Sequence, residues 1–362
     1  MKTQLSRNLL ESALNRCFEA CERKVSESEV NLEFCENKLK LTTKGPVTYY
    51  EETIPTISCD DDNAFSLKTS MLLEFVKHVG SEVIILSFSP EKKSCMVSTD
   101  TKKSKIAIPT LTSEFHLGQV GSFDVQFEIE NSHEFLSKMM HSMKFCSNDS
   151  HPFDSIHCKI TKDTLEVKAT NGPSFYSSKL DITSTGDLEV LLPKKSPVIL
   201  KNIFLEHFKK CSVNSRAMQF ESESCKLTIF IAKAEDDSIS EKILELTTQT
   251  ADAKIKVSVH EISKTLKFFC GIFDKNNVDL KIEDGILSIR YTEGQTGAIE
   301  TVTCEECSGS TETQYNPKSL LDCLDSIQSS WVNMDFIKIL DGFFLCKLTN
   351  TNTIILLCPA KL

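Results

Sequence analysis

Apolar residues recur at helical spacing in six segments of the chain, and the segments between them alternate apolar and polar residues as strands do. The predicted helices cover Ser6 to Lys24, Lys68 to Val79, Asn131 to Phe145, Lys194 to Lys210, His260 to Lys275 and Asn316 to Ile327. Ser6, Asn131 and Asn316 are predicted N-caps, because their side-chain oxygens can accept from the free N–H groups of a first helical turn. Runs such as Val30 to Phe34 predict strands, and Asp284-Gly285 predicts a hairpin turn.

The predicted helices recur with a period of about 63 residues. If Leu9, Leu72, Phe135, Ile199, Ile262 and Leu320 are equivalent positions, the successive steps are 63, 63, 64, 63 and 58 residues. One helix followed by a short meander of strands rarely buries both of its faces alone. We therefore predict an α+β fold of three tandem domains, residues 1–120, 121–249 and 250–362, each with two helices packed on antiparallel sheets.

The composition is typical of a soluble protein with several domains. The chain has 362 residues, of which 40% are apolar, enough to bury two or three cores. No apolar run reaches the ~18 to 20 residues of a membrane-spanning helix. The first residues, Met1 to Ser6, also lack the apolar stretch of a signal peptide. We therefore expect a cytoplasmic protein that has no membrane partner.

The cysteines do not indicate a disulfide framework. There are fifteen, an odd number in a long chain, so we interpret them as small buried residues that stay reduced. Cys304 and Cys307 have the spacing of a metal or redox pair, but a structural zinc site needs four ligands and no second pair lies at suitable spacing. We predict no metal and no cofactor. A thiol- or metal-dependent enzyme that uses this pair is the enzymatic alternative.

Positive charge is concentrated in the predicted helices. They hold 17 lysine and arginine residues against 10 aspartate and glutamate residues, although the whole chain has a net charge of −10. Glutamate forms helices as readily as lysine, so helix propensity does not explain the sign. The distribution favours a local basic surface on an otherwise acidic protein.

Two copies of the chain could enclose a duplex if all six predicted helices face one side of the fold. Twelve helices with ~9 Å between their axes form a circle roughly 110 Å around and about 35 Å across. Subtracting about 5 Å of helix radius on each side leaves an opening of about 25 Å, which admits a hydrated duplex. Closed two-fold dimers are the commonest oligomers, which is compatible with this closure.

Four short segments carry a resemblance to a known family. They are Ala169 to Gly172, Leu191 to Lys195, Tyr315 to Asp322 and Leu357 to Leu362. With these segments in collinear order, the chain resembles the bacterial DNA polymerase III beta subunit, the sliding clamp, over essentially its whole length.

The resemblance implies a head-to-tail dimeric ring whose hole is lined by twelve helices, with sheets outside and no catalytic activity. It implies a processivity factor that a clamp loader threads onto double-stranded DNA, without sequence preference, and that tethers the DNA polymerase and other proteins carrying clamp-binding peptides. The alternative is a scaffold that keeps the fold and the partner surface but does not encircle DNA.

A sliding clamp must hold phosphates without reading bases, which suits long, flexible cations. We predict DNA contacts from Arg23, Lys24, Lys77, Lys138, Lys194, Lys195, Lys201, Lys209 and Lys210. Asn148 and Phe153 match by position the loop residues that touch DNA in similar clamps. Phe153 is equally well explained as a core residue at the start of a strand.

Clamp partners insert a short peptide with apolar anchors into a groove between the middle and last domains. The resemblance places the walls of this groove at Thr170, Gly172, Phe175, Leu246, Asn316, Leu356, Cys358, Pro359, Ala360, Lys361 and Leu362. Asn171 to Phe175 departs from the Asp-Gly-His-Arg-Leu that is usual in the family, and Ser319 stands where an aromatic residue is common. The peptide preference therefore stays open.

The resemblance also pairs an edge strand of the first domain with an edge strand of the last. It implies a dimer interface formed by Lys105, Ile106, Ile108, Phe269, Ile272, Phe273 and Glu300, in which opposite charges set the register. Core packing within the last domain is the alternative explanation for part of the apolar helix end from Phe268 to Phe273.

Overall fold

The computed structural model describes residues 2–21, 28–60, 62–101, 103–112, 120–147, 154–204, 208–233, 243, 245–273, 277–293, 296–340 and 342–360. The chain forms two compact units. Unit 1 comprises Met1–Leu136, Ile182–Leu188 and Lys195–Lys233, and unit 2 comprises Ser137–Asp181, Glu189–Lys194 and Ala234–Leu362. The three predicted domains, with boundaries after residues 120 and 249, stay a prediction.

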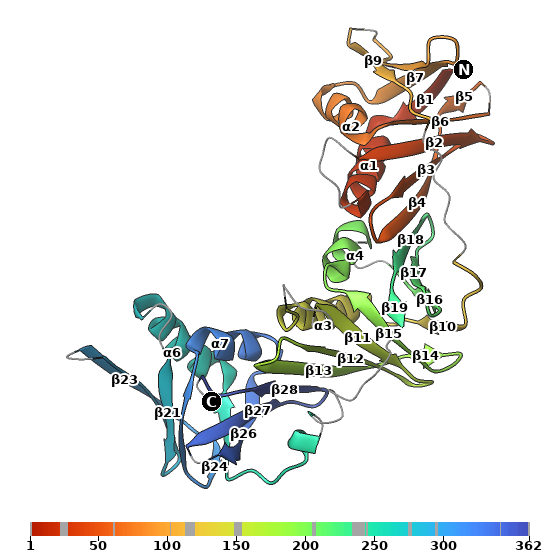
Figure 1. Ribbon diagram of the computed structural model, residues 1–362. Coiled ribbons are helices and arrows are strands. Elements are labelled where there is room, and N and C mark those ends of the chain that lie inside the picture. The colour runs from red at the N-terminus through yellow and green to blue at the C-terminus, as the bar shows by residue number, and fades with distance from the viewer. Residues whose placement is uncertain are drawn as a thin grey trace. The chain divides into compact units, whose positions relative to one another are not determined.

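Unit 1 contains two antiparallel sheets (Figure 1). The strand order of the first is β5 (Ser58–Cys59), β1 (Lys2–Ser6), β7 (Val83–Ser89), β8 (Ser94–Thr99) and β9 (Lys105–Pro109). The strand order of the second is β14 (Thr183–Ser184), β10 (Val125–Glu128), β16 (Lys210–Val213), β17 (Ala217–Glu221), β18 (Cys225–Phe230), β4 (Thr48–Pro55), β3 (Lys38–Lys44), β2 (Glu29–Cys35) and β6 (Asn63–Lys68). Because β4 pairs with β18, this sheet joins segments far apart in the sequence. The short strand β19 (Ala232–Lys233) ends the described part of unit 1.

Three helices of unit 1 pack against these sheets and one another. They are α1 (Arg7–Cys21), α2 (Thr69–His78) and α4 (Ser196–Phe204), and α1 contacts β3, β4, α2 and α4. Leu10, Ala13, Leu14 and Cys17 on α1 are fully buried, which is the predicted helical period. The chosen marker Leu9 is 43% exposed, so Leu10 is the buried residue of the first repeat, one position later than predicted.

Unit 2 contains a long sheet and a four-stranded sheet. The long sheet runs in the order β15 (Leu188–Pro193), β11 (Ser155–Ile160), β12 (Thr164–Thr170), β13 (Ser174–Asp181), β28 (Thr353–Leu357), β27 (Phe343–Thr349), β26 (Trp331–Leu340), β20 (Ala253–Ser258) and β24 (Glu306–Ser308). The four-stranded sheet runs in the order β23 (Thr296–Thr303), β22 (Ile286–Glu293), β21 (Val278–Glu283) and β25 (Thr311–Tyr315). The predicted turn at Asp284-Gly285 connects β21 to β22, with φ values of 51° and 80°.

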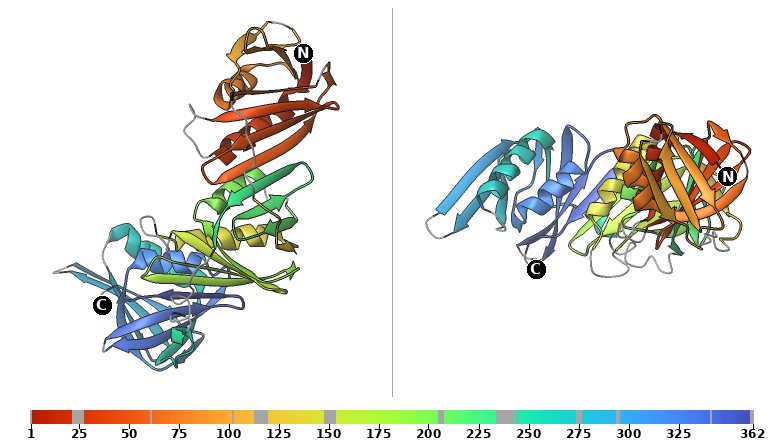
Figure 2. Two further views of the ribbon diagram at one scale, coloured as in Figure 1. Left: turned by 45° about the vertical axis from the view of Figure 1, so that its right-hand side comes forward. Right: turned by 90° about the horizontal axis from the view of Figure 1, so that it is seen from above.

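Helix α3 (Ser132–Lys144) precedes β11, and α6 (Val259–Ile272) and α7 (Pro317–Asp325) pack against each other in unit 2 (Figures 1 and 2). The predicted caps hold for two helices: Asn131 Oδ1 accepts from the Glu134 N–H at 3.0 Å, and Asn316 Oδ1 accepts from the Ser319 N–H at 3.0 Å. Ser258, which the sequence pattern did not single out, caps α6.

Each of the six predicted helices is present, but one is much shorter than predicted. Helix α4 ends at Phe204, and Lys210, which the spacing predicts in the same helix, begins β16. The apolar residues that predict this helix, Val198, Ile199, Ile203 and Phe204, all lie within α4, and the predicted end at Lys210 is too late.

The cysteines behave largely as predicted. All fifteen lie in the described residues and are free, and nine of them are buried. Burial raises the pKa of Cys95, Cys146 and Cys158 to about 12 each, so these thiols stay neutral. Cys35 and Cys307 are exposed and depart from the prediction. No helix in the described part of the chain combines the length and apolar character needed to cross a bilayer.

Candidate peptide groove and DNA-contacting lysines

A cluster of apolar side chains lies on the long sheet of unit 2. Phe175 on β13 is opposite Leu356 on β28 in the strand register, and Ile337 on β26 is opposite Leu345 on β27. These four side chains are only 2 to 3% exposed. The partly buried residues packed against them are Ile243, Leu246, Ala251, Ile354 and Cys358. We call these nine residues the groove cluster.

The groove cluster occupies the face of the sheet that α7 does not cover, and Ile243 and Leu246, which are helical residues of the same chain, pack against it. Ile354 and Leu356 are spaced two residues apart, so they share one face of β28, and Cys358 directly follows the strand. Tyr176 points to the other face of β13 and stacks on Phe145, directly after α3, with ring centroids 5.3 Å apart. Helix α7 also packs on β28. The four central side chains are thus covered by the chain's own residues, and the partly buried outer members of the cluster are the ones that an apolar side chain from outside can contact.

The turn between β12 and β13 forms one rim of the groove cluster. Thr170 Oγ1 donates to the Ser174 carbonyl at 2.8 Å and accepts from the Gly172 N–H at 3.1 Å. Gly172 has a φ of +94°, a conformation that favours glycine. The Cys358 N–H donates to the Pro173 carbonyl at 2.8 Å. These bonds place the predicted residues Thr170 and Gly172 on the turn that is hydrogen-bonded to Cys358.

The other predicted groove residues lie near the end of β28 or outside the described chain. Pro359 is buried, and the Ala360 N–H donates to the Gln314 carbonyl at 2.8 Å. Asn316 has a structural role as the cap of α7. Lys361 and Leu362 lie outside the described residues.

Sequence reasoning missed Ile243, Ala251, Ile337 and Leu345. Ile337 and Leu345 belong to a hairpin whose apolar residues could have been assigned to either face of the sheet. The strand register resolves this ambiguity. Leu356 on β28 lies opposite Phe175, and Leu345 on β27 lies opposite Ile337, so all four side chains share one face of the sheet.

The predicted DNA-contacting lysines fall into two groups. Lys77 on α2, Lys201 on α4 and the flanking residues Lys195, Lys209 and Lys210 are exposed, as a phosphate contact requires. Lys138 is 6% exposed and its ammonium donates to the Lys179 carbonyl at 2.6 Å, so its assignment to DNA is wrong. Arg23, Lys24, Asn148 and Phe153 lie outside the described residues.

The Lys194 side chain also bonds to backbone groups of the same chain. Its ammonium donates to the Cys146 carbonyl at 3.0 Å and lies 3.5 Å from the Ser147 carbonyl. These bonds hold the end of β15 against the segment that follows α3. Lys194 therefore positions the chain and is a poor phosphate contact.

Each unit has an edge strand that carries residues predicted to lie in the dimer interface. Among the described strands, β9 pairs only with β8 in unit 1, and β23 pairs only with β22 in unit 2. Lys105 is exposed and Ile106 is half-buried on β9, while Glu300 is exposed on β23. Ile272 at the end of α6 is 57% exposed.

Three apolar residues of the predicted interface serve the core of one chain. Ile108 and Phe269 are completely buried, so they cannot touch a second copy, and their assignment to the interface is wrong. Phe273 is half-buried and stacks on Tyr291 with ring centroids 4.0 Å apart. Ile299 on β23, which the sequence reasoning did not name, is 58% exposed and extends the apolar surface near this edge.

Comparison with solved structures identifies the fold. The beta clamp of Helicobacter pylori in complex with 3,4-difluorobenzamide matches at a TM-score of 0.85 and 20% identity, and the match covers 100% of both chains. The sliding clamp of Pseudomonas aeruginosa matches at a TM-score of 0.88 and 16% identity, again over 100% of both. The chain has the beta-clamp fold. The predicted α+β architecture of helices packed on antiparallel sheets is confirmed.

A further structure with the beta-clamp fold is the Helicobacter pylori clamp bound to a DNA ligase peptide, with a TM-score of 0.84, 18% identity and 100% of both chains covered. No protein-family model matches the sequence, and no curated protein sequence matches it significantly. The beta-clamp fold thus occurs here at 16 to 20% sequence identity to these solved clamps.

The observed helices carry a smaller excess of positive charge than the sequence predicts. Within α1, α2, α3, α4, α6 and α7 there are nine lysine and arginine residues against seven aspartate and glutamate residues. The predicted excess was larger because Lys194, Lys195, Lys209 and Lys210 flank α4 and are not part of it. The helices themselves are close to neutral.

The surroundings of Cys304 do not favour a reactive thiol. Burial raises the pKa of the Cys304 thiol to about 11, which disfavours the reactive thiolate. Glu305, between the two cysteines, binds the Lys256 ammonium at 2.7 Å. In the part of the chain that the structure describes, no three histidine, cysteine or acidic residues gather as metal ligands would.

Proposed function

We propose that the chain is a sliding clamp, a non-catalytic processivity factor that encircles double-stranded DNA and tethers a polymerase and other DNA-processing proteins. The single observation that carries the proposal is the groove cluster, an apolar cluster on the face of the long sheet opposite α7 whose five outer members are only partly buried. The full-length match to a clamp that binds a DNA ligase peptide supports this assignment of the cluster. Apolar anchors of a partner peptide would fill the groove, because concave apolar walls with few polar groups suit such ligands.

Ring closure is the second part of the proposal. The edges β9 and β23 would pair head to tail in a homodimer, since each presents unpaired backbone groups, β23 exposes Ile299 and β9 carries the half-buried Ile106. A clamp loader would open this ring on DNA in the cytoplasm. Exposed Lys77, Lys195 and Lys201 would contact phosphates.

The near neutrality of the helices favours a second candidate function, a clamp-like scaffold that does not encircle DNA. Both candidates use the groove cluster, so peptide binding does not separate them. Topological retention on DNA does.

The test is loading onto nicked circular DNA with loader and ATP, followed by gel filtration before and after linearisation. A clamp stays on the circle and slides off the linear product. Replacing Lys77, Lys195 and Lys201 with glutamate should reduce retention, whereas the matched replacements at exposed Lys38, Lys92 and Lys254 should not. Absence of retention by the unaltered protein, with peptide binding intact, favours the scaffold.

A further inference from the structure

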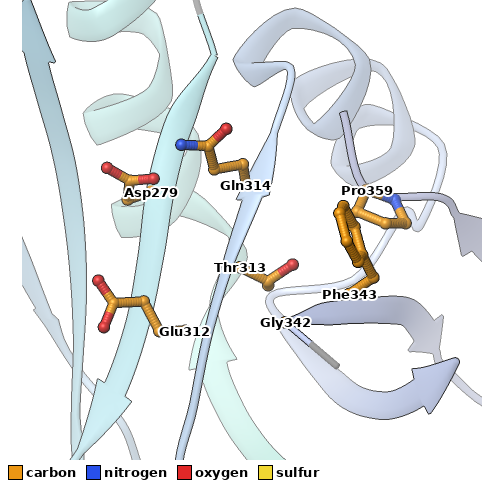
Figure 3. Close-up of a pocket in the computed structure, with 7 residues that line it drawn as sticks. All are labelled: Asp279, Glu312, Thr313, Gln314, Gly342, Phe343 and Pro359. Carbon is orange, nitrogen blue, oxygen red and sulfur yellow. The ribbon is translucent and has the colours of Figure 1, made fainter. Parts of the chain in front are cut away.

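Backbone hydrogen bonds fix the end of the groove cluster that follows β28. The Cys358 N–H donates to the Pro173 carbonyl, and the Ala360 N–H donates to the Gln314 carbonyl, both at 2.8 Å. Pro359, which lies between them in the chain, lines a separate pocket of about 270 Å³ (Figure 3). This end of the cluster therefore keeps its place without help from a particular side chain.

A short helical segment covers another part of the groove cluster. Ile243 and residues 245–247 have a helical backbone, and we call them the covering turn. Ile243 and Leu246 of this turn pack against the cluster. The turn ends at once, with the Thr248 N–H donating to the Glu245 carbonyl at 3.2 Å. A helix this short is not stable alone, so the position of the covering turn depends on its contacts with the sheet.

Lys347 on β27 makes one of these contacts. It lies directly opposite Leu356 in the strand register, so its side chain leaves the sheet on the face that carries the groove cluster. The Lys347 ammonium donates to the Thr247 carbonyl of the covering turn at 2.9 Å. It also lies 3.8 Å from a carboxylate oxygen of Asp335, which is its opposite residue on β26. The Lys347 side chain is only 19% exposed.

The partial burial of Lys347 makes its hydrogen bond to the covering turn a strong tether. An ammonium beside apolar side chains is destabilising unless it is paired and hydrogen-bonded. The Asp335 carboxylate offsets its charge, and the Thr247 carbonyl accepts from one of its three N–H donors. Moving the covering turn away from the sheet would break a charge-assisted hydrogen bond at a place with limited access to water. Lys347 therefore opposes that movement.

We infer that Lys347 is a positioning residue of the peptide groove. It holds the covering turn against the sheet, so that Leu246 already forms a wall of the groove before a partner peptide arrives. The inference rests on the proposed function, because it concerns the same peptide site. A wall that is ordered in advance tightens binding, since the peptide does not have to order it. Lys347 acts through the covering turn and does not itself contact the peptide.

The test measures binding of the DNA ligase peptide that binds the Helicobacter pylori clamp, labelled with fluorescein, by fluorescence polarisation. Lys347→Met keeps the length of the side chain and removes its donors. It should weaken binding about tenfold, the effect of losing one charged hydrogen bond. Lys347→Arg keeps N–H donors and should retain most of the affinity. The control Lys254→Met, at an exposed lysine on β20 of the same sheet, should leave the affinity unchanged.

A double-mutant cycle with Leu246→Ala separates positioning from direct contact with the peptide. In the unaltered protein, Leu246→Ala removes the wall and weakens binding. In the Lys347→Met background the wall is already displaced, so the same substitution should cause little further loss. If the two losses add in full, Lys347 contacts the peptide independently of the covering turn, and the inference is overturned.

Amide hydrogen exchange of the protein without peptide tests the tether by itself. Residues 245–249 should exchange faster in Lys347→Met than in the unaltered protein, while the urea midpoint stays nearly the same, because only a local opening is affected. Unchanged exchange in this segment overturns the inference, and so does unchanged peptide affinity in Lys347→Met when the unaltered protein binds the peptide. Failure of the unaltered protein to bind the peptide at all contradicts the peptide groove itself, whatever the exchange shows.

Discussion

Phe175 on β13 and Leu356 on β28 lie directly opposite each other in an antiparallel strand pair, and both are 3% exposed. The pair joins segments from the predicted second and third domains into one sheet. The apolar groove cluster is therefore a property of this strand pairing, and the residues at its rim can be changed without removing the core beneath them.

Filling the groove should block peptide binding with little loss of stability. Cys358 is half-buried at the rim, so the substitution Cys358→Trp projects an indole over the cluster without forcing it into the packed core. We expect the labelled ligase peptide to bind more than about tenfold more weakly, by fluorescence polarisation. The control Cys307→Trp, at an exposed cysteine on β24, should leave peptide affinity unchanged. Equal affinity in the two variants would remove the groove cluster from the peptide site.

A charge introduced at the exposed apolar residues near the β23 edge should weaken the proposed dimer. Ile272 and Ile299 are 57% and 58% exposed, and a carboxylate at either position would have to be desolvated when the two edges pair. We expect Ile272→Asp with Ile299→Asp to shift the protein toward monomer in light scattering. Ile57→Asp changes an isoleucine of the same exposure, 57%, away from this edge and should leave the mass unchanged.

The buried ion pair in unit 1 should respond unequally to loss of its two members. Arg16 Nε donates to Glu52 Oε2 at 3.0 Å, and the Tyr50 hydroxyl donates to the same oxygen at 2.7 Å. The Glu52 side chain is 2% exposed and that of Arg16 is 26% exposed. Arg16→Met strands a buried carboxylate, at a cost of about 3 to 5 kcal/mol, whereas Glu52→Gln leaves a guanidinium that can still reach water.

Urea unfolding at pH 7 measures this difference. The midpoint should fall further for Arg16→Met than for Glu52→Gln. The reverse order would contradict this reasoning. It would show that the Glu52 carboxylate is better solvated than its exposed fraction indicates, or that the Arg16 guanidinium is less well solvated than its exposed fraction indicates. Glu51→Gln, on the same strand but at a carboxylate that is 24% exposed and paired with Lys40, provides the control and should have a smaller effect.

Sequence periodicity predicted the helices well because each buries one apolar stripe, as Leu10, Ala13, Leu14 and Cys17 do on α1. The same reasoning failed where burial continues beyond a helix. Phe208 follows α4, is 1% exposed and packs against Phe204, so the apolar pattern gave no sign that the helix had ended. The charge assigned to that helix was overestimated for this reason.

The candidate site was predictable only in part. Phe175, Leu246, Leu356 and Cys358 were assigned through the resemblance and lie in the groove cluster. Ile337 and Leu345 could not be assigned, because their place depends on the pairing of β26 with β27 and of β27 with β28. Burial of a charged residue is equally invisible in a sequence: Lys138 is like any surface lysine in pattern, yet its ammonium binds the carbonyl of Lys179.

Acid should destabilise the fold partly through His141 on α3. Burial, and then the charge of Lys144, lower the pKa of this side chain to about 4 from an ordinary value of 6.5, against the opposing influence of Asp325. Its Nδ1 atom is buried without a hydrogen-bond partner among the described residues. The unfolded chain therefore binds a proton between pH 6.5 and about 4 that the folded chain does not. The stability due to neutral His141 is complete above this window and is lost as the pH falls through it.

The substitution His141→Gln removes this titration and should flatten the fall of the urea midpoint between pH 7.5 and 5. The difference between variant and unaltered protein isolates His141 from the carboxylates, which titrate in both. His78→Gln, at a histidine of α2 whose side chain is 79% exposed, should follow the unaltered protein. Parallel curves for the His141 variant and the unaltered protein would contradict this prediction. They would mean that the His141 imidazole reaches water in the folded state and that α3 packs less tightly against its neighbours than the structure shows.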